Sequence, residues 1–119
     1  MRLIGSKTEQ DFRDEFIKSH NSLFNEHCND RLLNVLRTNF PNMKTAYFIG
    51  ITPDQGEDLY TMLIDTNTIS FIELDRYNLL IEPIVEFISI DDYRQGLSKC
   101  QQIKLLVALD LAQEDLKLR

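Results

Sequence analysis

The middle of the chain alternates between short strand-forming segments and turn residues, and this pattern constrains the fold more than any other feature. Residues 45–51, 59–65 and 68–74 are rich in β-branched, aromatic and other apolar residues. Pro53 and Gly56 lie in the first connection, and Thr66 and Asn67 form the second. Because both connections are short, we expect three antiparallel strands that follow one another as a meander.

A fourth strand is predicted over residues 79–90. This segment is almost wholly apolar and is interrupted by Glu82 and Glu86. Pro83 has no backbone N–H to donate to a central ladder. We therefore expect an edge strand or a bulged strand here.

Helical patterns flank the strands. Capping boxes begin at Ser6 and Ser98, and apolar residues then recur at three- and four-residue steps. Helices are predicted over about residues 8–26, 30–40, 90–95 and 99–116. The resulting order is α-α-β-β-β-β-α-α, which favours an α+β fold, a four-stranded antiparallel sheet with helices mainly on one face.

Size and composition favour one folded domain over residues 1–119. The chain is 43% hydrophobic and 27% charged, which is typical of globular proteins. The first residues lack the apolar run of a signal peptide, and no segment reaches the roughly 18 apolar residues that span a bilayer. We expect a cytoplasmic protein without a membrane partner.

Negative charge is concentrated in the strand region. Residues 45–93 hold ten acids against one base, Arg76, a net charge of −9 within a chain whose net charge is −6. A basic partner would turn this self-repulsion into attraction and would associate faster. The same sign argues against direct binding of nucleic acid.

The acids of the predicted sheet are therefore the candidate partner-binding residues. Glu82 and Glu86 are expected to share one strand face with Ile84 and Ile88, as an acidic and apolar strip typical of an interface. The full candidate set is Asp54, Glu57, Asp58, Asp65, Glu73, Asp75, Glu82 and Glu86. The alternative is that these acids form a solvated face that keeps the sheet soluble.

Metal and cofactor binding are not indicated. A zinc site would need His20, His27, Cys28 and Cys100, yet the adjacent His27 and Cys28 point in different directions on a helix. Both histidines are predicted to be half-buried on the first helix, each hydrogen-bonded through one ring nitrogen. Both cysteines are predicted to be reduced and at least partly buried, and a disulfide between them is the alternative. No phosphate-binding motif occurs.

Carboxylate pairs such as Asp91-Asp92 do not by themselves indicate an enzyme. These two residues fit the first turn of a helix, where negative charge is stabilised. An uncharacterised small enzyme remains an alternative, with two or more carboxylates or Cys100 converging in a pocket. We expect no catalytic residue.

The whole chain resembles the immunity proteins of bacterial polymorphic and contact-dependent-inhibition toxins, which are small, acidic, cytoplasmic, single-domain proteins without catalytic motifs. The closing run at residues 104–110, KLLVALD, is similar in character. The resemblance implies tight binding to one cognate toxin domain, often a basic nuclease. The other alternative is a small acidic secretion chaperone that binds an effector segment at a sheet edge. The sequence leaves open whether the chain is a monomer or a homodimer.

Overall fold

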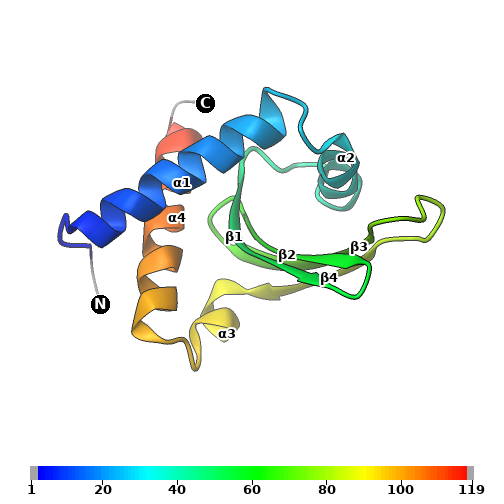
Figure 1. Cartoon of the computed structure of the whole chain (residues 1–119). Coiled ribbons are helices and arrows are strands. Elements are labelled where there is room, and N and C mark those ends of the chain that lie inside the picture. The colour runs from blue at the N-terminus through cyan, green and yellow to red at the C-terminus, as the bar shows by residue number, and fades with distance from the viewer. Residues whose placement is uncertain (1–2, 118–119) are drawn as a thin grey trace.

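The computed structural model describes residues 3–117 and confirms the predicted element order (Figure 1). Met1 and Arg2, the start of the segment without a signal-peptide pattern, lie outside this range. No helix in the described range is long and apolar enough to cross a bilayer. The elements are α1 (Lys7–Phe24), α2 (Asp30–Asn39), β1 (Ala46–Asp54), β2 (Glu57–Ile64), β3 (Thr68–Asp75), β4 (Ile84–Ser89), α3 (Ile90–Arg94) and α4 (Lys99–Lys117).

The four strands form one antiparallel sheet in the order β1-β2-β3-β4, as the turn pattern predicts. β1 and β2 run further than predicted, so only Gln55 and Gly56 connect them, and Gly56 has a φ of +85°, which favours glycine. The β2–β3 turn places Asp65 at a φ of +52°. β1 and β4 are the two edges, which confirms the edge position predicted for the fourth strand.

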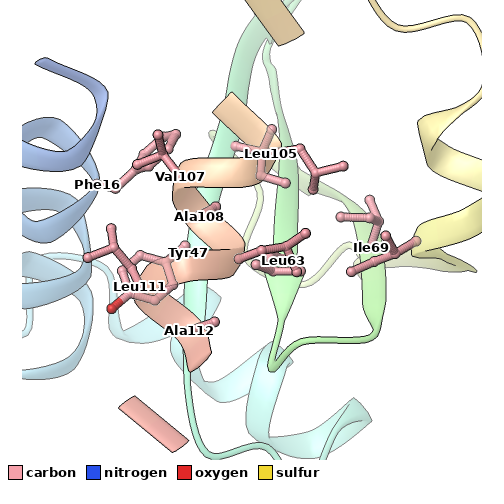
Figure 2. Close-up of a cluster of buried hydrophobic side chains, with 12 residues drawn as sticks. Phe16, Tyr47, Leu63, Ile69, Leu105, Val107, Ala108, Leu111 and Ala112 are labelled. Carbon is pink, nitrogen blue, oxygen red and sulfur yellow. The ribbon is translucent and has the colours of Figure 1, made fainter. Parts of the chain in front are cut away.

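Helices cover both faces of the sheet, with more of them on one face. Tyr47, Leu63 and Ile69 point to the side of α1 and α4 and pack with Phe16 and Leu105 (Figure 2). The alternate strand residues, among them Met62 and Ile72, pack with α2 and the end of α1 in a second buried cluster. The central strands are therefore apolar on both sides. This explains their lack of a simple polar alternation.

Capping boxes fix both long helices at the predicted positions. The Ser6 hydroxyl accepts from the Glu9 amide at 3.3 Å, and the Glu9 carboxylate accepts from the Ile4 and Gly5 amides. The bond from Ile4 is the main reason that the pKa of Glu9 lies below its ordinary value. At α4, Ser98 and Gln101 exchange both capping bonds.

The fourth strand is shorter than predicted, and the prediction of one strand over residues 79–90 is wrong for its first part. The Asp75 carboxylate accepts from the Tyr77 and Asn78 amides, and the Asn78 side chain accepts from the Leu80 amide. These local bonds turn the chain away from a ladder. Pro83 directly precedes β4, so the strand begins where backbone donors become available again.

Three side-chain predictions in the helical regions need correction. Cys28 and Cys100 are free, as expected, but both are exposed rather than partly buried. Cys28 lies in the α1–α2 link, and Cys100 lies in the first turn of α4 on its solvent side. α1 ends at Phe24, so His27 lies outside the helix, is exposed, and bonds Asp30 at 3.0 Å. His20 is half-buried on α1 and bonds Thr45, as predicted.

Candidate protein-binding surface

Five of the eight candidate acids gather at one end of the sheet. The β1–β2 turn and the β3–β4 connection lie at this end, which we call the hairpin end and define as residues 54–58 and 75–82. Strand register brings the acids together, since Glu57 pairs with both Asp54 and Asp75. In Figure 1 the yellow-green β3–β4 connection projects away from α1 and α4. The acids are Asp54, Glu57, Asp58, Asp75 and Glu82.

Two of these five acids stabilise the hairpin end itself. Asp58 lies 2.8 Å from the Arg76 guanidinium, and this hydrogen bond is the main reason that the pKa of Arg76 is raised. Asp75 accepts the amides of Asn78 and Tyr77, which lower its pKa, and Arg31 of α2 lowers it further. Arg31 also donates to the Asp75 carbonyl. The other three acids of the end are exposed and available to a partner.

Asp65 lies at the opposite end of the sheet and does not belong to the surface. Its carboxylate accepts from the Lys44 and Thr45 amides at 2.9 and 3.0 Å. These bonds tie the start of β1 to the β2–β3 turn. We assign Asp65 a structural role.

Glu73 and Glu86 lie on the sheet face that carries α4, beyond the part covered by the helices. Glu73 pairs with Leu59 on one side and with Ile84 on the other, and Glu86 pairs with Phe71. Glu86 and Ile84 are exposed. The predicted acidic and apolar strip is therefore present for Glu86, whereas Glu82 lies in the connection before the strand.

The hairpin end and β4 expose large apolar side chains that were not predicted as binding residues. Leu80 is 92% exposed and Tyr77 is 79% exposed. The apolar run predicts a paired strand at residues 79–81, but the turn residues directly before it, Asp75-Arg-Tyr-Asn78, are a signal for a projecting turn. The complete group is Tyr77, Leu79, Leu80, Ile81, Ile84 and Phe87.

Contacts between the two connections hold the hairpin end together. The Arg76 amide donates to the Gly56 carbonyl at 2.7 Å. The Tyr77 ring lies over Gly56, where an added Cβ would approach it to 3.4 Å, and the Arg76 guanidinium lies 5.9 Å from the ring centroid. Tyr77 therefore lies against the β1–β2 turn with most of its side chain still exposed.

A polar network lies on the other side of the molecule. Asp115 of α4 accepts from the Thr45 hydroxyl at 2.7 Å and from the Tyr47 hydroxyl at 2.5 Å. His20 of α1 lies 3.0 Å from the Thr45 hydroxyl and stacks on Tyr47. Burial, followed by the bond to Asp115, raises the pKa of Tyr47. The network joins α1, β1 and α4, and we assign it a structural role.

No cluster of metal-ligand type accompanies these surfaces. Within residues 3–117, no three His, Cys, Asp or Glu side chains come close enough to hold a metal ion. Cys28 and Cys100 lie in separate elements. The chemistry that the described surface offers is charge and apolar contact.

Comparison with known proteins gives no match: no family model matches the chain, and neither a curated protein nor a solved structure does.

Proposed function

We propose that this chain is a protein-binding module that uses the hairpin end and the adjacent exposed face of β4. The observation that carries the proposal is the exposure of six large apolar side chains on the hairpin end and on the two faces of β4, beside exposed acids such as Glu57, Glu82 and Glu86. Single exposed apolar residues are ordinary on protein surfaces, but several large ones exposed on neighbouring segments beside acids are typical of an interaction site. Tyr77 and Phe87 are of the residue types that serve as interface anchors.

The role that fits this surface is that of an immunity protein, which neutralises a cognate toxin domain by binding it. Glu57, Glu82 and Glu86 are exposed and would meet Lys and Arg side chains that a nuclease uses to hold phosphates. Electrostatic attraction would speed association, and burial of the apolar group would slow dissociation. The proposal places the chain in the cytoplasm, with a basic protein as partner and no cofactor.

The proposal is tested by co-expressing the chain with the protein encoded beside it. The expected result is a complex of defined stoichiometry in which the partner's enzymatic activity is abolished. Tyr77→Ala or Leu80→Ala should weaken the complex by about 30-fold or more, because removing an interface anchor typically costs about 2 kcal/mol.

Ile17→Ala is the matched control, because Ile17 is also an exposed apolar residue, 48% accessible, but lies on α1. It should leave binding unchanged. An equal loss in all three variants, or a partner that remains active when bound, would contradict the proposal. A partner that binds through an extended segment and keeps its activity would instead favour the secretion-chaperone alternative.

A further inference from the structure

β4 offers an open edge for strand addition. In the described sheet β4 pairs with β3 alone, through six residues from Ile84 to Ser89. In an antiparallel ladder, alternate residues of an edge strand direct their N–H and C=O groups away from the sheet. Proteins usually protect such an edge with lysine or a bulge, whereas β4 carries Val85, Phe87 and a single charge, Glu86.

A groove runs along this edge on the side of α2. It has a volume of about 480 Å³ and lies between α2 and the start of β4. Beyond the groove, Phe40 at the end of α2 meets Phe87 edge-to-face at 6.0 Å between ring centroids. A strand placed beside the start of β4 would therefore have α2 on one side and the exposed side chains of Ile84 and Glu86 on the other. The lining residues are Arg31, Asn34, Val35, Thr38, Asn39, Pro83 and Val85.

The two sides of β4 differ in charge. Val85 and Phe87 belong to the sheet face on which α2 packs, and Glu86 belongs to the opposite face with Ile84 and Ile88. Within residues 3–117, none of the ion pairs involves Glu73, Glu82 or Glu86. The exposed Glu86 carboxylate is therefore available to a base that a partner would supply.

We propose that a basic protein partner adds an extended strand to β4. Residues directly opposite each other in a sheet share a face, so the partner residue opposite Glu86 is Lys or Arg. Its neighbours, opposite Val85 and Phe87, point towards α2 and are apolar. This inference rests on the proposed function and names the contact through which the partner is recognised.

Charge complementarity favours such a partner over a second copy of this chain. Two copies of this chain could pair through β4 as antiparallel strands related by a two-fold axis. When the middles of the two strands face each other, the two Glu86 side chains lie opposite or diagonal to each other. Like charges in these positions destabilise a sheet. Each copy also carries a net charge of −6.

The test is a titration of the isotope-labelled full chain with a capped peptide in which valine and lysine alternate. NMR shifts and slower amide exchange are expected at residues 84–89. Glu86→Lys should weaken binding by about tenfold or more, a loss of about 1.4 kcal/mol. Asp14→Lys makes the same change in net charge on exposed α1 and should alter the affinity by less than about twofold.

Three outcomes would overturn the inference. They are an absence of shifts at β4, equal binding of a peptide in which valine and glutamate alternate, and a dimer of the free chain that buries the same edge. The proposed function can hold when strand addition fails. In that case a complex with the neighbouring gene's product depends on Tyr77 and Leu80 but leaves residues 84–89 unprotected.

Discussion

The part of the sheet that packs under α1 and α4, with Tyr47, Leu63 and Ile69, is called the covered half. The covered half and the hairpin end both carry large apolar residues, but the covered half buries them and the hairpin end exposes them. Leu63 and Ile69 are fully buried beneath α1 and α4, whereas Leu80 and Tyr77 project into solvent. Both regions belong to one sheet, so composition alone does not separate them. The difference lies in what covers each region. Helices complete the first, and we propose that a partner completes the second.

The largest expected effect is on the covered half. Leu63→Ala removes a side chain that is 0% exposed and should lower the free energy of unfolding by about 2–5 kcal/mol. Leu80→Ala should change it by less than about 0.5 kcal/mol, because Leu80 has almost no neighbours to lose. Urea unfolding measures both. Similar losses in the two variants would remove the contrast between the regions.

The polar network of the covered half should give the next largest effect. Asp115→Ala leaves the Thr45 and Tyr47 hydroxyls without their acceptor and should cost about 1–3 kcal/mol of unfolding free energy. Glu114→Ala, one position earlier on α4 and exposed, is the matched control and should cost less than about 0.5 kcal/mol. Thermal or urea unfolding of the pair decides, and equal losses would mean that the network adds no stability.

Alkaline pH should lower the stability of the covered half. The pKa of Tyr47 is raised above 10.0, so the folded state keeps a proton that the unfolded state releases. This stability is fully present below pH 10 and is lost as the pH rises towards the folded pKa, by at most about 1.4 kcal/mol per pH unit. Tyr47→Phe should show a shallower decline in urea unfolding above pH 10. A slope equal to that of the unsubstituted chain would contradict this assignment.

The smallest expected effect on stability, with a clear effect on binding rate, belongs to the exposed acids. Glu57→Lys and Glu82→Lys should leave unfolding nearly unchanged and slow association with the partner, more so at low salt. Stopped-flow association at two salt concentrations measures this. Asp65→Lys should differ, because it removes the acceptor of two backbone amides and should destabilise the fold. An association rate that changes neither with these substitutions nor with salt would show that the acids do not steer binding.

The sequence predicts correctly those parts of the fold that depend on hydrogen bonds between residues close together in the chain. The capping boxes at Ser6 and Ser98 and the meander turns act within four residues, so the pattern alone identified them. The start of β4 was misplaced because the apolar run from Leu79 outweighed the turn formed by Asp75 and Asn78. The split of the acids into structural and exposed members depends on strand register and on Arg76 and Lys44, which spacing does not reveal. The same holds for Asp115, 70 residues from Thr45.

Hydrogen exchange of the chain with and without the co-expressed partner compares the two regions in one experiment. We expect protection to appear at residues 54–58 and 75–89, whereas α1 and α4 should exchange as in the free chain. Protection confined to α1 and α4, with the hairpin end unchanged, would contradict it.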